Sequence, residues 1–398
     1  MDKKVKSVLF VIDSLRIGGA EKSLVTLLNL FDYEKYQVDL MLFARGGEFE
    51  ELLPKQVHVL EVPEMFKYSQ IPWSSLKTKF KSPLKMFVQL KYSFGIRATR
   101  SDSVNQAVLL WKSYGRCIQE LEKKYDCAIA YGQGAPTFYV ADKVYAKRKI
   151  AWVNAVYLPE DGNLKYIDKI YHKYDKVVGV SDNIKKLLLG TFGIPKSNVT
   201  VIKDIIDASF AKRMARWSST VLTDMSNGKN KILTVGRLSD KKGQDLAIQA
   251  AELLKNANVD FVWYFVGDGE TKNLLSKMIL ELHLENNVVL LGGRSNPYPY
   301  FENCDIYVQP SRSEGFGISL AEAKLFGKPV VATKFNSVNE QIQNEVNGLI
   351  VDMSPKGIMN GIITLLTQNS LREKCVANAL SEEIENKNEI DKVYDIIN

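Results

Sequence analysis

The segment 313–323, S-E-G-F-G-I-S-L-A-E-A, combines residue types suited to binding a phosphate and a sugar. Gly315 and Gly317 allow the backbone to approach a ligand closely, and the N-terminus of the helix expected to follow attracts an anion. Glu314 precedes that helix and Glu322 lies about one turn into it, so both carboxylates can face one ligand. A carboxylate can accept hydrogen bonds from two neighbouring hydroxyls of a sugar or ribose. The alternative is an ordinary strand–loop–helix junction with solvated glutamates.

A second motif, G-R-L-S-D-K-K-G at 236–243, lies between an expected strand and an expected helix. An Arg can bind a diphosphate bidentately, and a Lys supplies a compact positive charge. Arg237 and Lys242 are the candidates, with Lys241 as a competitor whose side chain could equally be solvated. Gly236 opens the turn.

Three further loops follow expected strands. The glycine pair Gly18-Gly19 precedes Ala20 and Glu21 at an expected helix N-terminus, which can bind an anion or simply permit tight packing. Gly267-Asp268-Gly269 either underlies a nucleotide or forms an ordinary turn. Arg294, after a Gly-Gly pair, either stacks on a base or is merely exposed. None of these loops is a G-x-G-x-x-G or P-loop motif.

Taken together, the E-G-F-G-x-S-x-x-E-A, G-R-L-x-x-x-K-G and G-G-A-E patterns resemble those of retaining family 4 glycosyltransferases of the GT-B fold. These are the "glycosyl transferases group 1" of bacterial surface-polysaccharide synthesis. The resemblance implies that Arg237 and Lys242 contact the donor diphosphate, and that these two with Glu314 act in catalysis. It implies a donor site made of Gly18, Gly19, Gly236, Gly267, Arg294, Glu314, Gly315, Phe316, Gly317, Ile318 and Glu322.

Two positions depart from the family pattern. Many relatives have His after an I-x-W-x strand, where this chain has Asn154. Asn can hydrogen-bond a sugar hydroxyl but cannot act as an acid or base near neutral pH. Asp204 replaces an Asn common before the interdomain linker. These changes affect the expected sugar contacts, for which Asn154 and Glu21 remain candidates for the donor sugar or the acceptor.

The expected reaction moves a sugar from a UDP- or GDP-linked donor to an acceptor hydroxyl, and the resemblance implies retention of anomeric configuration. The donor is a co-substrate, and no cofactor is expected. The chain has no D-x-D motif, so cationic side chains and helix dipoles are expected to replace a metal. A double displacement using both glutamates is rejected, because they are better explained as anchors for hydroxyls.

Short β-branched runs alternate with amphipathic stretches, which predicts an α/β protein of two Rossmann-like, doubly wound parallel-sheet domains facing a cleft. Strands are expected at 5–12, 38–43, 57–62, 127–130, 150–153, 176–180 and 199–202, then at 231–235, 261–266, 287–291, 305–309, 329–332 and 349–351. The expected parts are an N-terminal acceptor-side domain (1–207), a linker (208–230), a nucleotide-sugar domain (231–375) and a C-terminal helix packing back across the boundary (376–398).

The 398 residues include 53 Lys and Arg and 46 Asp and Glu. The four cysteines and three histidines form no metal-binding pattern, so no structural metal is expected. No apolar run reaches the roughly 20 residues that cross a bilayer. The apolar run near the N-terminus is too short for a signal peptide. We therefore expect a cytoplasmic protein that can contact the inner face of the plasma membrane.

The segment 67–116 carries ten basic residues and one acid, interleaved with aromatics that include Trp73, Phe87 and Trp111. This composition favours peripheral contact with an anionic membrane and a lipid-linked glycan acceptor. A solvated helical pair or a partner protein are the alternatives. Nucleic acid is not expected, because no binding module accompanies the basic residues.

Other functions share the expected fold. A sugar-nucleotide epimerase would release free sugar from the donor alone, and a phosphorylase would need a pyridoxal phosphate site for which the sequence gives no sign. A non-catalytic scaffold for a partner glycosyltransferase would have no need of Arg237, Lys242, Glu314 and Glu322 together.

Overall fold

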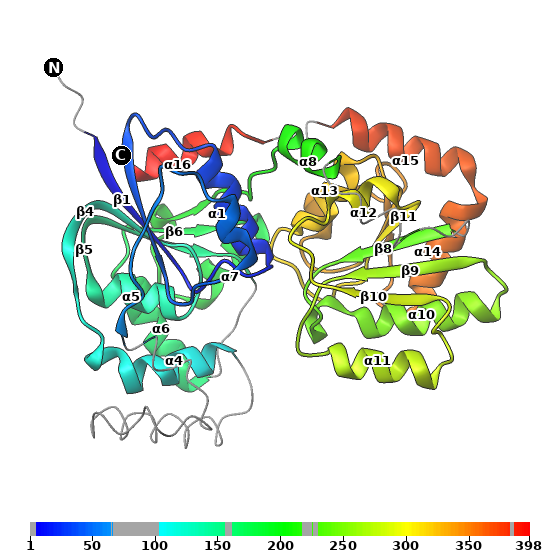
Figure 1. The fold of residues 1–398 in the computed structure, drawn as a ribbon, viewed down its shortest axis with the longest axis horizontal. Coiled ribbons are helices and arrows are strands. Elements are labelled where there is room, and N and C mark those ends of the chain that lie inside the picture. Colours follow the sequence, from blue (N-terminus) through cyan, green and yellow to red (C-terminus); the bar gives the residue numbers. More distant parts are fainter. Residues whose placement is uncertain are drawn as a thin grey trace. The chain divides into compact units, whose positions relative to one another are not determined.

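The chain forms two compact units in the computed structural model, which describes residues 5–64, 66, 103–155, 161–216, 225, 230–382 and 386–398. The first unit contains Met1–Arg16, Ala20–Lys203 and Glu389–Asn398, and the second contains Ile17–Gly19 and Asp204–Asn388. Each unit has its own parallel sheet flanked by helices (Figure 1). The predicted pair of Rossmann-like domains is therefore confirmed.

The sheet of the first unit has seven strands in its described part, in the order β3-β2-β1-β4-β5-β6-β7, all parallel. Its central strand β1 is buried from Val8 to Ile12, because helices cover both faces of the sheet. The strands are β1 Lys6–Ile12, β2 Tyr36–Leu42, β3 His58–Val59, β4 Leu121–Ala130, β5 Val144–Val153, β6 Lys176–Gly179 and β7 Val199–Val201. The helices are α1 Gly19–Asn29, α4 Ser103–Tyr114, α5 Ala135–Lys143, α6 Asp161–Tyr171 and α7 Asp182–Thr191.

The sheet of the second unit has six described strands in the order β10-β9-β8-β11-β12-β13, again parallel. The strands are β8 Asn230–Val235, β9 Phe261–Val266, β10 Val288–Gly292, β11 Ile306–Gln309, β12 Val330–Thr333 and β13 Leu349–Val351. The helices are α8 Ala208–Ala215, α10 Gln244–Asn256, α11 Lys272–Glu281, α12 Tyr298–Asn303, α13 Ile318–Leu325, α14 Pro355–Thr367 and α15 Asn369–Ser381. The chain order reverses between β8 and β11, and a switch of this kind is where open α/β sheets bind ligands.

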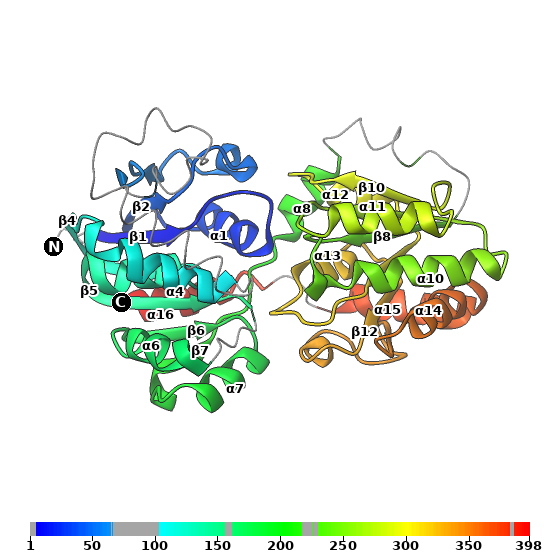
Figure 2. The same cartoon turned by 90° about the horizontal axis from the view of Figure 1, so that it is seen from below.

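Helices cover both faces of the second sheet. Figure 1 shows α10 and α11 along one face and α12 and α13 along the other, and Figure 2 shows α14 beside α10. The core joins buried residues of β8, β9 and β11 to those of α10 and α14, including Trp263 and Phe265, whose rings stack at 5.6 Å. These layers fix the carboxyl ends of β8 and β11 next to each other.

Several strands extend beyond the predicted bounds. Strand β4 starts at Leu121 and β5 at Val144, earlier than the 127–130 and 150–153 expected. The added residues of β4 include the exposed run Glu122–Lys124, and its register shifts between Leu121 and Tyr125. A solvated strand end carries no apolar pattern, which is why the sequence did not reveal it.

The segment 208–230, expected to be a linker with a short helix, contributes helix α8 to the second unit. Helix α8 begins after Asp207, whose side chain accepts a hydrogen bond from the N–H of Phe210. The ring of Phe210 contacts that of Tyr298, and Asn296 Nδ2 donates to Met214 O at 2.8 Å. Helix α8 is thus packed against α12.

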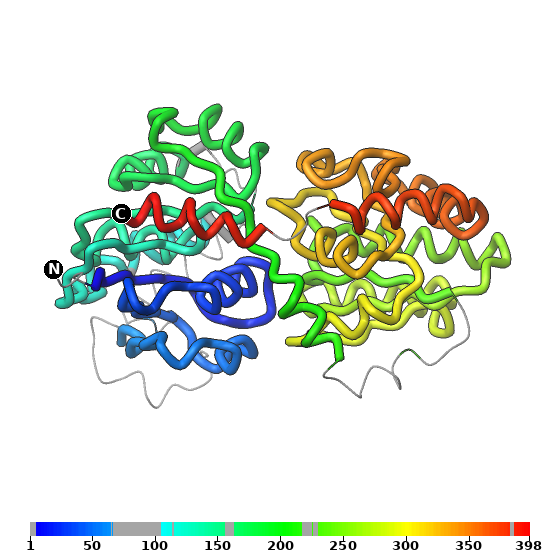
Figure 3. Tube along the Cα trace, turned by 90° about the horizontal axis from the view of Figure 1, so that it is seen from above, coloured from blue at the N-terminus to red at the C-terminus, as the bar shows by residue number. Residues whose placement is uncertain are grey.

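The chain after residue 376 is not one helix. Residues up to Ser381 end α15 in the second unit, and a separate helix α16 (Glu389–Ile397) lies in the first unit (Figure 3). The Tyr394 ring stacks on that of Tyr36 at 5.2 Å and an interplanar angle of 6°. Tyr394 Oη accepts a 2.8 Å hydrogen bond from the N–H of Asp32. The last helix therefore completes the aromatic core of the N-terminal unit.

Most of the basic segment, 67–102, lies outside the described residues. Its described end contains α4, where Trp111 is buried. Trp111 Nε1 donates to Asp142 Oδ2 at 2.9 Å, and its ring lies 6.0 Å from that of Phe138. The prediction that Trp111 belongs to an exposed membrane-binding face is therefore wrong: it belongs to the core. Among the described helices, none has the length and apolar character needed to cross a membrane.

Candidate active site

The two main sequence motifs follow adjacent strands of the second sheet. Strand β8 pairs with β11 through Ile232 with Ile306 and Leu233 with Tyr307. The loops that leave their carboxyl ends, 236–243 and 310–317, therefore meet at the switch point of the sheet.

The two loops touch through their backbones. Gly243 has a φ of +65°, and a Cβ added there would lie 2.1 Å from Pro310 O. The Arg312 N–H donates to Lys241 O at 2.8 Å. Only a glycine permits this approach at residue 243, so the glycine that ends the first motif has a packing reason as well as a place in the motif.

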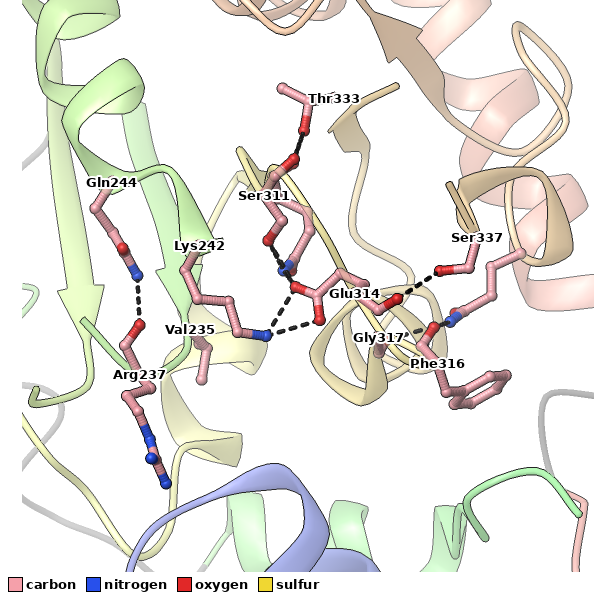
Figure 4. A network of polar contacts seen from close by, with 12 residues as sticks. Val235, Arg237, Lys242, Gln244, Ser311, Glu314, Phe316, Gly317, Thr333 and Ser337 are labelled. Atoms are coloured by element: carbon pink, nitrogen blue, oxygen red, sulfur yellow. Dashed lines mark hydrogen bonds and ion pairs between the residues drawn. The ribbon is translucent and has the colours of Figure 1, made fainter. Parts of the chain in front are cut away.

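An ion pair joins the loops at their centre. Lys242 Nζ donates to both carboxylate oxygens of Glu314, at 2.8 and 2.7 Å, and Figure 4 shows the two side chains directed toward each other. Glu314 Oε1 also accepts from Gln309 Nε2 at 2.5 Å and from Ser311 Oγ at 2.6 Å. Glu314 is 6% exposed. Because its carboxylate is buried, the donors that compensate its charge are these protein groups.

Arg237 differs from Lys242. Arg237 is exposed, and its guanidinium extends away from Lys242 and Glu314 (Figure 4). In the part of the chain that the structure describes, no carboxylate forms an ion pair with it. Its backbone carbonyl accepts from Gln244 Nε2 at 2.9 Å, which fixes the turn to the start of α10. A positive charge is thus presented to solvent at the switch point.

Side chains from outside the loop after β11 hold it in place by hydrogen bonds to its backbone carbonyls. Gln341 Nε2 donates to the carbonyls of Phe316 and Gly317, and Ser337 Oγ donates to Glu314 O at 3.3 Å. Gly317 has a φ of +87° and precedes α13, which starts at Ile318. The first N–H groups of a helix have no partner within it, so this N-terminus can bind an anion.

Glu322 lies in α13 and is 3% exposed. Burial raises the pKa of Tyr298 well above its usual value, and the charge of Glu322 and its hydrogen bond to that tyrosine add to the rise. Burial raises the pKa of Tyr307 likewise, with contributions from the charges of both Glu314 and Glu322. One buried phenol is therefore within electrostatic reach of both glutamates, which places them in the same region of the unit.

The glycines of 267–269 have a packing explanation. A Cβ on Gly267 would lie 1.9 Å from Gly236 O, and one on Gly269 would lie 2.2 Å from Leu238 O. The backbone of this turn therefore packs directly against the motif loop after β8. Arg294 is exposed, and its Nε donates to Tyr300 Oη at 3.0 Å. These contacts involve protein groups alone.

The remaining candidates lie at the carboxyl edge of the first sheet. Gly18 lies in the loop after β1, α1 starts at Gly19, and Glu21 is in its first turn. Asn154 follows β5, and its Nδ2 donates to Tyr131 O at 3.2 Å. Its Oδ1 is buried with no hydrogen-bond partner among the described residues. That oxygen can accept a hydrogen bond from a ligand hydroxyl.

Several residues that contact the motif loops were missed by sequence reasoning, among them Gln309, Ser311, Arg312 and Gln341. Gln309 and Ser311 border the strand end that was expected to be apolar, and a single polar residue there carries no motif. Arg312 precedes the recognised glutamate motif by two positions and was passed over. Among the described residues there is no cluster of three or more His, Cys, Asp or Glu that could hold a metal ion.

Comparison with known proteins relates the chain to glycosyltransferases. Residues 223–382 match the family described as glycosyl transferases group 1. A Campylobacter jejuni protein named N-acetylgalactosamine-N,N'-diacetylbacillosaminyl-diphospho-undecaprenol 4-alpha-N-acetylgalactosaminyltransferase is 27% identical over 370 residues, covering 91% of this chain and 90% of that protein.

Solved structures show the same fold. HepE of Anabaena, in complex with UDP and glucose, superposes with a TM-score of 0.71 at 20% identity, over 98% of both chains. WaaG, a glycosyltransferase involved in lipopolysaccharide biosynthesis, gives a TM-score of 0.65 at 15% identity, over 98% of this chain and 99% of that one. The architecture is therefore the GT-B fold. The match to the glycosyl transferases group 1 family falls within the second unit.

Proposed function

We propose that the protein transfers a sugar from a nucleoside diphosphate sugar to an acceptor hydroxyl with retention of configuration. The observation that carries the proposal is the arrangement at the switch point of the second sheet. There the exposed Arg237, the Lys242–Glu314 pair and the N-terminus of α13 come from two loops in direct contact. Cations beside a helix N-terminus suit a diphosphate. A buried carboxylate suits the hydroxyls of the sugar or ribose that the diphosphate carries.

The diphosphate is expected to compete with Glu314 for Lys242. Without a ligand, both carboxylate oxygens of Glu314 accept from Lys242 Nζ. A diphosphate next to the ammonium can take over one of its three donors, while Gln309 and Ser311 continue to hold Glu314 in place. Arg237 then adds a second positive charge. As the anomeric bond breaks, both cations stabilise the negative charge that grows on the leaving diphosphate.

Retention is proposed to occur by attack from the face of the leaving group. Glu314 is a poor nucleophile, because its carboxylate already accepts from Lys242, Gln309 and Ser311. The departing phosphate would accept the proton of the acceptor hydroxyl. We assign Glu322 to the hydroxyls of the ribose, and the same two cations and helix N-terminus to the role that a divalent ion has in other glycosyltransferases.

A lipid-linked glycan is the proposed acceptor, at the cytoplasmic face of the membrane. The Campylobacter jejuni relative is named for a diphospho-undecaprenol substrate. The basic segment 67–116 offers the positive charge that anionic lipid headgroups attract. Polysaccharide assembly is the corresponding biological role.

The donor site is tested by incubating the full chain with UDP-glucose, UDP-N-acetylglucosamine, UDP-N-acetylgalactosamine and GDP-mannose, and by measuring thermal stabilisation and hydrolysis. One of these donors should raise the Tm and be turned over, and added EDTA should leave the rate unchanged. Glu322→Ala should raise the KM for that donor about 10-fold, because it removes one charged hydrogen-bond acceptor. Failure of all donors to bind would remove the proposal.

The stereochemistry and the membrane contact need separate measurements. The proton NMR spectrum of the product should show the same anomeric configuration as the donor, and an inverted product would exclude the proposed attack. Vesicles containing phosphatidylglycerol should sediment the protein at low salt, and neutral phosphatidylcholine vesicles should not. Equal recovery in both supernatants would exclude the membrane contact.

A further inference from the structure

A second ion pair joins the two motif loops outside the Lys242–Glu314 contact. Arg312 Nη1 and Nη2 donate to Asp245 Oδ1 and Oδ2 at 2.7 and 2.6 Å, a bidentate arrangement. Arg312 Nη1 also donates to Asp240 O at 2.7 Å. Arg312 belongs to the loop after β11, whereas Asp240 and Asp245 flank Lys242 on the loop and helix after β8. One guanidinium therefore holds the other loop on both sides of Lys242.

The backbone reinforces this contact. The N–H groups of Arg312 and Ser313 both donate to Lys241 O, at 2.8 and 3.3 Å. Burial alone would raise the pKa of Asp245, but hydrogen bonds and positive charge from Arg312 lower it, so the pair is ionised at neutral pH. Both side chains are about 30% exposed or less. A planar fork with two parallel bonds restricts orientation more than a single lysine contact would.

We propose that Arg312 and Asp245 are positioning residues that hold Lys242 where it can stabilise the leaving diphosphate, without themselves contacting the donor. This inference rests on the proposed function for the identity of the reaction. The physical reason is the length of the lysine side chain. If the loop moves, the long side chain of Lys242 moves with it, and its ammonium shifts relative to the diphosphate. A shift of about 1 Å in a catalytic group can lower the rate roughly 100-fold.

The contact itself is tested without any substrate. Amide hydrogen exchange at residues 312 and 313 should become about 10-fold faster in Arg312→Ala and in Asp245→Asn, because the loop-to-loop bonds to Lys241 O open more often. Lys277→Ala removes an exposed ion pair of the same unit, with Glu281 on α11, and should change nothing at these amides. Unchanged exchange in both loop variants would overturn the proposal.

The catalytic consequence is tested with the donor from the screen above that the wild type turns over fastest. Arg312→Ala and Asp245→Asn should each lower kcat roughly 10- to 100-fold and change KM less than about 3-fold. Arg312→Lys should recover only part of the rate, because it cannot form the bidentate contact. Adding Arg312→Ala to Lys242→Ala should lower kcat by no more than about 2-fold, since both changes remove the same effect.

Three outcomes would overturn the positioning role. One is a kcat within about 2-fold of wild type in both loop variants. The second is a double variant whose loss is the product of the single losses, which is the sign of independent structural damage. The third is tighter donor binding in Asp245→Asn, which would show that a released Arg312 contacts the donor. If the wild type turns over no donor, the proposed function fails, while hydrogen exchange still decides whether the contact orders the loops.

Discussion

The two sheets share the strand order 3-2-1-4-5-6, counted within each unit, yet the contacts described at their carboxyl edges differ in kind. In the second unit, charged pairs tie neighbouring loops together at the switch point. In the first unit, the polar contacts around Tyr131 join neutral groups: Tyr131 Oη lies 2.8 Å from Ser23 Oγ, and its carbonyl accepts from Asn154. A rigid charged site suits a diphosphate, and neutral hydrogen-bonding groups suit sugar hydroxyls.

If the comparison holds, the largest effect should come from the exposed cation of the second unit. Arg237→Ala should lower kcat by roughly 10²- to 10³-fold, because it removes a preorganised charge that acts on the leaving group. Steady-state kinetics with the preferred donor would measure this, with Lys277→Ala as the control. A kcat within about 2-fold of wild type would show that Arg237 does not act on the leaving diphosphate.

The next effect concerns stability. Glu314→Ala should destabilise the second unit by about 3 kcal/mol, because Gln309, Ser311 and Lys242 all lose their shared acceptor in a largely buried place. Urea denaturation would measure the change. Glu314→Gln keeps one oxygen acceptor and should cost less than Glu314→Ala. Equal losses in the two variants would mean that packing, and not hydrogen bonding, dominates at this residue.

A glycine in each unit provides a matched test of close packing. Gly267→Ala should destabilise the protein by about 2 kcal/mol, because its Cβ would lie 1.9 Å from Gly236 O and must displace the motif loop. Gly190 is in α7 with open space around it, so Gly190→Ala should stabilise the first unit by about 0.5–1 kcal/mol. Thermal unfolding of the two variants would give opposite shifts in Tm. Shifts of the same sign would contradict the packing explanation for Gly267.

The smallest expected effect is on the first unit. Asn154→Ala should lower acceptor-dependent transfer about 3- to 10-fold, the value of one lost hydrogen bond, and leave donor binding unchanged. Donor hydrolysis and transfer to acceptor, measured side by side, separate the two. If donor affinity fell instead, Asn154 would belong with the donor contacts, and the division between charged contacts in the second unit and neutral contacts around Tyr131 would have to be redrawn.

The sequence predicted the elements better than their contacts. Buried parallel strands such as Val8–Ile12 are continuous apolar runs, and Gly-rich loops mark the turns that follow them, so local pattern suffices. Lys242 and Glu314 were assigned separately to diphosphate and sugar, although the structure pairs them. They are 72 positions apart, and no local pattern in a single sequence reports a contact at that separation. Arg312 was missed for the same reason, because its partner Asp245 lies 67 positions away.

The location of α16 has a consequence for biosynthesis. Residues 389–398 supply the tyrosine that stacks on Tyr36 and covers Phe31, both of which are synthesised long before it. The N-terminal unit therefore cannot complete its core as its own strands emerge, and has to wait until residues 389–398 have been made. The buried cluster described for the second unit is built from residues between Ile232 and Leu365, so it can pack before residues 389–398 are made.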